Sequence, residues 1–171
     1  MELEKVRGIA EDLKKQLSPY CERVEIAGSI RRQKPEPGDI ELLCIPKYRS
    51  DINLLDSRIT LIMGQGMLAL RRNKRGNTTF GPKNKLLVHV ESGIGIDVFS
   101  TTEECWWVAL VVRTGPKESN IAIAVAAQKK GWHLMAYGDG FNTPRGIVRC
   151  ESERDVFELI GLPYREPWER K

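Results

Sequence analysis

Two acids that follow a glycine–serine turn are the residues of this sequence best placed to do chemistry. Gly28-Ser29 precedes Asp39 and Glu41, which stand two positions apart. Side chains alternate between the faces of a β-strand, so acids at this spacing share one face. Paired carboxylates repel each other unless a cation lies between them, and hard oxygen ligands suit Mg²⁺ or Mn²⁺. We therefore predict a divalent-metal site at Asp39 and Glu41.

The turn before these acids carries groups that bind phosphate. Its backbone N–H groups and the Ser29 hydroxyl can donate to phosphate oxygens, and the arginines that follow, Arg31 and Arg32, can clamp them. Arg32 is the more direct candidate, since Arg31 can equally brace the turn through a salt bridge. A metal site and a phosphate site this close in sequence indicate chemistry on a nucleotide.

A third acid joins this group from a later segment. Asp97 interrupts the apolar run 94–99, which we expect to be a strand. An isolated acid inside an apolar strand is costly to bury unless it is paired or bound to a metal. Taken alone, Asp39 and Glu41 could equally be solvated acids at a strand end. The Gly28-Ser29 turn upstream and Asp97 downstream favour the metal site.

The elements that must position these residues form a first lobe. Apolar residues at helical spacing predict helices at 2–17 and 52–63, the second capped by Asp51. Short apolar runs predict strands at 24–27, 40–45, 67–72, 86–90 and 94–99. The last two of these strands are expected to be joined by a hairpin turn.

Beyond Phe99 the sequence pattern changes, which predicts a second lobe. Helices are expected at 103–112, 118–130 and 155–160, with short strands at 133–137 and 146–149. We predict an α+β fold in two domains, residues 1–102 and residues 103–171.

Composition excludes several classes of protein. The chain has 171 residues, of which 41% are hydrophobic and 29% charged, and its net charge of +4 is compatible with a polyanionic partner. No apolar run reaches the roughly 18–20 residues of a membrane helix, and the N-terminus does not read as a signal peptide. The scattered cysteines argue against a zinc or disulfide framework. We expect an intracellular, non-secreted protein of the cytoplasm, the nucleoid or a virus-infected cell.

The chain resembles the family X DNA polymerases, the group that includes DNA polymerase beta, within the nucleotidyltransferase superfamily. Gly28-Ser29, Asp39, Glu41 and Asp97 fill the superfamily pattern in order. More specific matches run to the end of the chain, at residues 28–32, Gly38, 113–116, Asn120, 130–132, 135–138, 155–157 and 164–170. The resemblance implies a nucleotidyltransferase-type palm, a mixed β-sheet with flanking helices, followed by a small α+β nucleotide-binding lobe.

The resemblance also implies a role for each site residue. Asp39 and Glu41 would hold two Mg²⁺ or Mn²⁺ ions, and Asp97 would hold the catalytic one. The dNTP phosphates would be bound by the turn at Gly28 and by Ser29, Arg32 and Gly38. The sugar and base of the nucleotide would be lined by Arg113, Gly115 and Asn120.

Several positions depart from the family pattern. Glu41 stands where many members carry aspartate, and Gly95 stands where better-known members place an arginine near the primer terminus. Val112-Arg113 replaces two aromatic residues, and Ala124 replaces an arginine that contacts the template. The lyase and helix-hairpin-helix segments of longer members have no counterpart here, so we expect no lyase activity.

A basic segment is the candidate contact for the DNA backbone. It lies after the second predicted helix and consists of Arg71, Arg72, Lys74, Arg75, Lys83 and Lys85. Runs of charge are often only solvated faces, and that alternative stays open. Contact with DNA phosphates would make binding weaken with salt, because counterions are released on binding.

These features predict a monomeric DNA polymerase that adds deoxynucleotides to a primer 3′-hydroxyl by a two-metal mechanism, filling short gaps during DNA repair. Its partners would be primer-template or gapped DNA and a nucleoside triphosphate, with no membrane partner. The alternatives are a nucleotidyltransferase that modifies a small molecule, a tRNA or a protein, and a non-catalytic DNA-binding module.

Overall fold

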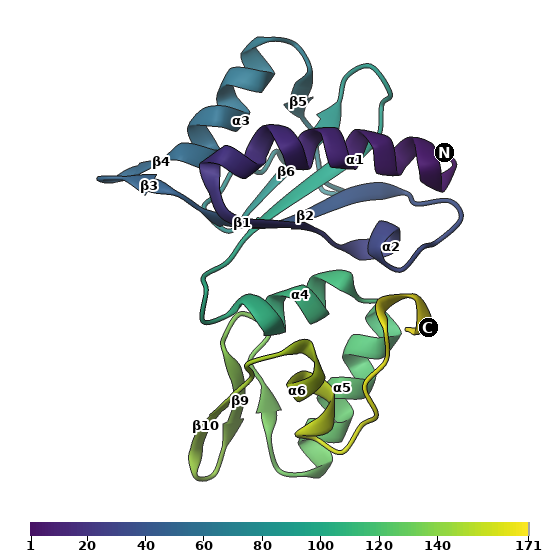
Figure 1. Ribbon diagram of the computed structural model, residues 1–171, viewed down its shortest axis with the longest axis vertical. Helices are drawn as coiled ribbons and strands as arrows, with labels where there is room; N and C mark the ends of the chain where they lie inside the picture. The colour runs from purple at the N-terminus through teal and green to yellow at the C-terminus, as the bar shows by residue number, and fades with distance from the viewer. Residues whose placement is uncertain (171) are drawn as a thin grey trace.

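The computed structural model describes residues 1–170 and divides the chain into two lobes (Figure 1). The N-terminal lobe contains α1 (Leu3–Leu17), η1 (Ser18–Tyr20), β1 (Cys21–Ile26), α2 (Gly28–Arg31), β2 (Asp39–Pro46), β3 (Tyr48–Arg49), β4 (Ile52–Asn53), α3 (Leu54–Gly64), β5 (Leu68–Leu70), β6 (Asn84–His89) and β7 (Gly95–Ser100). The C-terminal lobe contains α4 (Trp106–Thr114), α5 (Lys117–Lys129), β8 (His133–Leu134), β9 (Gly140–Thr143), β10 (Gly146–Arg149), α6 (Glu153–Glu158) and η2 (Pro167–Glu169).

A five-stranded mixed sheet forms the centre of the N-terminal lobe, in the order β1-β2-β7-β6-β5. The β2–β7 pair is parallel and the other pairs are antiparallel. This confirms the predicted α+β fold with a mixed sheet and flanking helices. The C-terminal lobe has a smaller antiparallel sheet, β10-β9-β8. The domain boundary at residues 102 and 103 falls between β7 and α4 and stays a prediction.

One face of the large sheet is buried beneath α1 and α3 (Figure 1). Ile40, Leu42 and Cys44 of β2 point into this core, where they meet apolar residues of both helices. Each fully buried aliphatic side chain contributes about 1.5–3 kcal/mol relative to its exposed state. Because side chains alternate along the strand, the same burial turns Asp39, Glu41 and Leu43 to the opposite face.

That opposite face meets the C-terminal lobe. Leu43 of β2 and Phe99 of β7 join Trp106 and Leu110 of α4 in a second buried cluster. The Arg23 guanidinium lies over the Trp106 ring at 4.4 Å. The acids at the start of β2 therefore lie on the face of the sheet that looks toward the second lobe.

The two lobes are also joined by a buried ion-pair network. Arg31 of α2 donates two hydrogen bonds to the Glu153 carboxylate, at 2.8 and 2.7 Å, and Arg170 donates a third at 3.2 Å. Arg31 also donates to the Thr114 hydroxyl at 2.9 Å. Arg31 thus forms a salt bridge, as its alternative interpretation predicted, but the pair is largely buried and joins the two lobes instead of bracing the turn. The C-terminal segment is fastened by the same network.

Glu153 makes the stability of this network depend on pH. Burial opposes the ionised carboxylate, but the hydrogen bonds and charge of Arg31 outweigh it and lower the pKa of Glu153 below its usual 4.5. A lowered carboxylate pKa stabilises the fold above the unfolded value, and this contribution is lost as pH falls through the folded value.

We therefore expect the contribution of Glu153 to the melting temperature to be lost as pH falls below about 4.5. The Glu153→Gln variant should show a shallower acid limb, because it has no carboxylate to protonate at this position. Differential scanning calorimetry of both proteins across this range measures the effect. Parallel acid limbs in the two proteins would contradict it.

Two local predictions are corrected by the fold. The cap of α3 is Asn53, not Asp51: its side chain accepts a hydrogen bond from the Asp56 N–H at 3.1 Å. The helix begins later than predicted because Ile52–Asn53 pairs with β3 as β4. The strand expected at 133–137 is only β8, since the chain leaves the sheet after Leu134.

Candidate active site

The structure brings the three predicted acids to one face of the sheet. In the parallel β2–β7 pair, Glu41 lies beside Asp97 and Asp39 lies beside Gly95. Residues that pair across a sheet point to the same face. The two acids of β2 and the single acid of β7 are therefore neighbours, although they are far apart in sequence.

This clustering changes the ionisation of the acids. Burial, followed by the charges of Asp39 and Asp97, raises the pKa of Glu41 from 4.5 to about 7. Burial also raises the pKa of Asp97, although the charge of Arg71 opposes this. Burial is the main cause of both shifts, and the neighbouring carboxylates add to the shift of Glu41. The hard oxygen donors and the charge of the cluster fit a divalent cation.

A guanidinium occupies part of this cluster. Arg71 donates a hydrogen bond to the Asp97 carboxylate. Within residues 1–170, this contact is the one ion pair that Asp97 forms. Among these residues, no three His, Cys, Asp or Glu side chains stand together as a ready-made metal centre. The metal-ligand roles of Asp39, Glu41 and Asp97 stay a prediction.

The glycine–serine turn packs directly against Glu41. Gly28 has a φ of +60°, and a Cβ atom there would lie 1.5 Å from Glu41 Oε2. Only glycine allows both this backbone conformation and this close approach. Ser29 is 9% exposed, and its hydroxyl has no hydrogen-bond partner within residues 1–170. An orphaned buried hydroxyl beside the acids fits a phosphate ligand.

Arg32 reaches from the N-terminal lobe to the start of the second one. It donates a hydrogen bond to the Thr114 carbonyl, at the end of α4. A Cβ atom at Gly115 would lie 3.3 Å from the Arg32 guanidinium. Glycine at position 115 therefore leaves room for the arginine. Arg32 also lowers the pKa of Glu41, although burial dominates.

A groove of 510 Å³ lies beside these residues and has the size of a small-ligand site. Five of the predicted site residues line it: Arg32, Glu41, Arg113, Gly115 and Asn120. The Asn120 amide donates to the Val112 carbonyl at 2.9 Å, and its oxygen has no hydrogen-bond partner among the described residues. Gly38 lies exposed just before β2, with nothing within 4 Å of a Cβ atom placed there.

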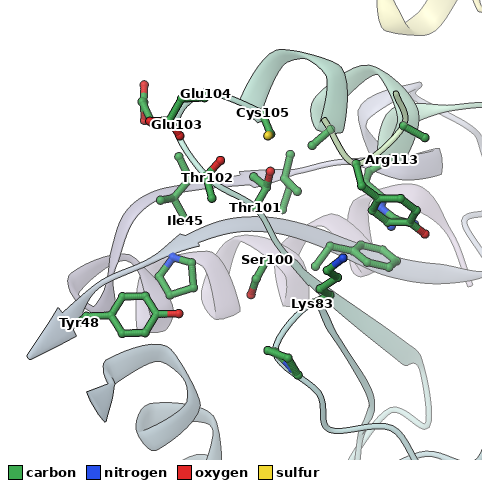
Figure 2. A pocket seen from close by; sticks show the side chains of 17 residues that line it. Ile45, Tyr48, Lys83, Ser100, Thr101, Thr102, Glu103, Glu104, Cys105 and Arg113 are labelled. Carbon is green, nitrogen blue, oxygen red and sulfur yellow. The ribbon is translucent and has the colours of Figure 1, made fainter. Parts of the chain in front are cut away.

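Arg113 is held in place by aromatic rings from both lobes. Its guanidinium lies 3.8 Å from the centre of the Phe99 ring and 5.6 Å from that of Tyr137. A second cleft of 460 Å³ opens on this side, between the two lobes. Figure 2 shows Arg113 and Lys83 at one end of this cleft and Tyr48 at the other. Sequence reasoning missed Phe99 and Tyr137, because cation–π contacts have no signature in sequence.

The predicted DNA-contact residues fall into three groups. Arg72, Lys74, Arg75 and Lys83 are exposed, so a contact with DNA stays a prediction for them. Arg71 is turned to Asp97. Lys85 is 0% exposed; its ammonium lies 2.7 Å from an Asp56 oxygen and donates to the Gly81 carbonyl at 3.0 Å. Its predicted role in DNA binding is therefore wrong, since a buried, paired ammonium cannot reach a phosphate.

Known proteins that are similar to this chain are DNA polymerases. Residues 109–171 match the family described as DNA polymerase beta thumb. DNA polymerase lambda of Rattus norvegicus is 29% identical to the chain over 160 residues, which cover 84% of this chain and 28% of that protein. The DNA polymerase/3′-5′ exonuclease PolX of Bacillus subtilis (strain 168) is 23% identical over 161 residues, which cover 93% of this chain and 26% of that protein.

Solved structures agree with this assignment at the level of fold. Leishmania infantum polymerase beta, in a ternary P/T complex and in a ternary gap complex, superposes on the whole chain with a TM-score of 0.80 at 18% identity. The chain covers 76% and 70% of those two structures. The resemblance to the family X DNA polymerases, predicted from the sequence, is confirmed.

The chain spans just over a quarter of the length of each curated relative, 28% and 26%. Among residues 1–170, no helix combines the length and the apolar character that crossing a membrane requires.

Proposed function

We propose that the chain is a DNA-directed DNA polymerase that adds deoxynucleotides to a primer 3′-hydroxyl and fills short gaps in DNA. The observation that supports this proposal most is the meeting of Asp39, Glu41 and Asp97 on one sheet face beside the Gly28-Ser29 turn. The similarity to DNA polymerase lambda and PolX favours DNA as the acceptor.

The acids would hold the metal ions, Asp39 and Glu41 contacting two Mg²⁺ or Mn²⁺ ions and Asp97 one of them. Such ions stabilise the attacking and leaving oxygens of a phosphoryl transfer. Asp97 would lie nearest the primer 3′-hydroxyl and help to accept its proton. The α-phosphate of the dNTP is attacked in line, a new phosphodiester bond forms, and pyrophosphate leaves.

The turn and its neighbours would hold the triphosphate. The Ser29 hydroxyl, the Arg32 guanidinium and the Gly38 N–H are the proposed donors to its β- and γ-phosphates. Charge on these oxygens grows in the transition state, so donors fixed in advance stabilise it more than the ground state. Arg113 and Asn120 are proposed to line the sugar and base of the nucleotide. Arg113 is held by its contact with the Phe99 ring, and Asn120 by its hydrogen bond to the Val112 carbonyl.

Lys83, one of the exposed lysines of the basic segment, should contribute to DNA binding through its charge. Lys83 lies 5.3 Å from the Tyr137 ring, at the mouth of the cleft between the lobes. We expect Lys83→Gln to weaken DNA binding and to reduce the slope of log K against log salt concentration by about one. Fluorescence anisotropy at several salt concentrations measures this slope.

Lys85→Met is the matched control in the same segment, because the Lys85 ammonium is buried against Asp56. Folded Lys85→Met protein should keep the wild-type salt slope, while its melting temperature falls. If both variants reduced the salt slope equally, Lys83 and Lys85 would not differ in their contribution to DNA binding, and this prediction would be contradicted.

The test of the proposed function is a comparison of acceptors with Mg²⁺ or Mn²⁺ present. Labelled nucleotides are offered with one-nucleotide-gapped DNA, tRNA, protein and a small-molecule acceptor. We expect transfer to the DNA primer end, directed by the template base. Transfer to another acceptor without primer extension would support the alternative nucleotidyltransferases, and DNA binding without any transfer would support a non-catalytic module.

A further inference from the structure

Arg71 belongs to the same row of the sheet as the acids. It follows β5, and its backbone N–H donates to the Leu86 carbonyl at 3.0 Å, which continues the β5–β6 register. Leu86 pairs with Asp97, and Asp97 pairs with Glu41. Paired residues share a face, so this row places a cation and two acids on the same side of the sheet.

The side chain of Arg71 then spans the sheet from its edge to β7. Its Nε donates to the Leu87 carbonyl at 3.2 Å, and its Nη2 donates to Asp97 Oδ1. These two contacts fix the guanidinium from both ends. Asp97 receives no other hydrogen bond within residues 1–170, so its second carboxylate oxygen stays available to a ligand.

Gly95 makes this arrangement possible. A Cβ atom there would lie 3.2 Å from Arg71 Nε, and all three nearest atoms belong to the Arg71 side chain. Gly95 and Asp97 stand two apart on one strand and share a face. A guanidinium from the sheet edge thus fills the space that a side chain at position 95 would take.

We infer that Arg71 is the positioning residue of Asp97: it holds one carboxylate oxygen from across the sheet and leaves the other free for catalysis. This inference rests on the proposed polymerase function. A rigid carboxylate matters because a displacement of about 1 Å in a reacting group can cost about 100-fold in rate. The residue acts through Asp97 and does not itself contact the nucleotide.

The first measurement is the kinetics of nucleotide insertion. For Arg71→Gln we expect kcat to fall by about 10- to 100-fold while KM for the dNTP changes less than about twofold, because Asp97 is misplaced but the nucleotide groove is intact. Arg7→Gln is the control, since Arg7 forms an exposed ion pair with Glu4 on α1. It should keep wild-type kinetics.

The second measurement needs no turnover. Mn²⁺ binding to the protein without DNA or nucleotide is followed by electron paramagnetic resonance. Arg71→Gln should bind Mn²⁺ about fivefold more tightly or better, because a cation next to a ligand opposes a second cation. Arg71→Lys keeps the charge without the guanidinium fork and should bind Mn²⁺ like the wild type.

The third measurement is second-site rescue. Because the three atoms nearest to a Cβ at position 95 all belong to Arg71, Arg71→Ala combined with Gly95→Arg should bring a guanidinium to Asp97 from its own strand and recover most of the kcat lost by Arg71→Ala alone. Circular dichroism melting identifies any variant that fails to fold. If an Arg71 variant does not fold, Arg71→Lys takes its place in the kinetic comparison.

The outcomes separate this inference from the proposed function. If wild-type protein extends no primer, the polymerase proposal fails, while the Mn²⁺ measurement still tests Arg71. If the wild type extends primers and Arg71→Gln matches it in both kcat and Mn²⁺ affinity, the positioning role is overturned. Arg71→Gln protein that binds Mn²⁺ more weakly would also overturn it.

Discussion

Asp39→Asn is expected to reduce nucleotide insertion by roughly 1000-fold or more, because it removes a charged ligand that would contact both metal ions. Asn retains the size of the side chain, so the strand and the buried residues beneath it are undisturbed. The register of β2 with β7 places this carboxylate in the cluster. Single-turnover insertion at a primer end measures the loss directly.

The control for this prediction is Asp12→Asn. Asp12 is an exposed acid on α1, on the far side of the sheet from the cluster, and its loss should leave the rate unchanged. Both variants should keep wild-type melting temperatures to within a few degrees. Asp39→Asn protein with more than about a tenth of the wild-type rate would contradict a metal-ligand role for Asp39.

Glu153→Gln is expected to destabilise the protein by about 3 kcal/mol or more, since it leaves two arginines facing each other without a counter-charge. The Glu153 carboxylate accepts hydrogen bonds from Arg31 and Arg170, and the Arg170 side chain is 0% exposed. For a chain of this size the melting temperature should fall by roughly 10 °C. Urea unfolding measures the free energy.

Glu158→Gln on the same helix is the matched control. Glu158 pairs with Arg154 at 2.8 Å, but both side chains are at least half exposed. Surface pairs of this kind contribute at most about 1 kcal/mol. Equal losses of stability in the two variants would show that the Arg31–Glu153–Arg170 network does not hold the lobes together.

The parts of the site that sequence could predict are those set by local rules. Strand alternation placed Asp39 and Glu41 on one face, and the acid in an apolar run predicted Asp97 as their partner. Gly28-Ser29 was recognisable as the end of a strand, although the structure forms the short helix α2 from these residues and not a turn. These features depend on residues that are close together in the chain or, for Asp97, on the high cost of burying an unpaired charge in an apolar strand.

The parts that sequence could not predict depend on long-range pairing. Nothing near Lys85 in sequence shows that its buried ammonium pairs with Asp56 of α3, so Lys85 was grouped with the exposed cations. Glu153 is the hub of an interlobe network only because α6 packs beside α2 and the end of α4. The sequence showed that Gly95 stands where related polymerases have an arginine. Only the register of β5, β6 and β7 shows that the Arg71 side chain fills the space beside Gly95.

Insertion of one nucleotide at a gapped primer end, by wild-type protein and by Asp97→Ala, tests the central claim most directly when DNA binding is measured in the same samples. We expect templated insertion by the wild type with Mg²⁺ or Mn²⁺, and no insertion by Asp97→Ala at unchanged DNA affinity. Equal insertion by both proteins, or none by either on DNA that both bind, would contradict it.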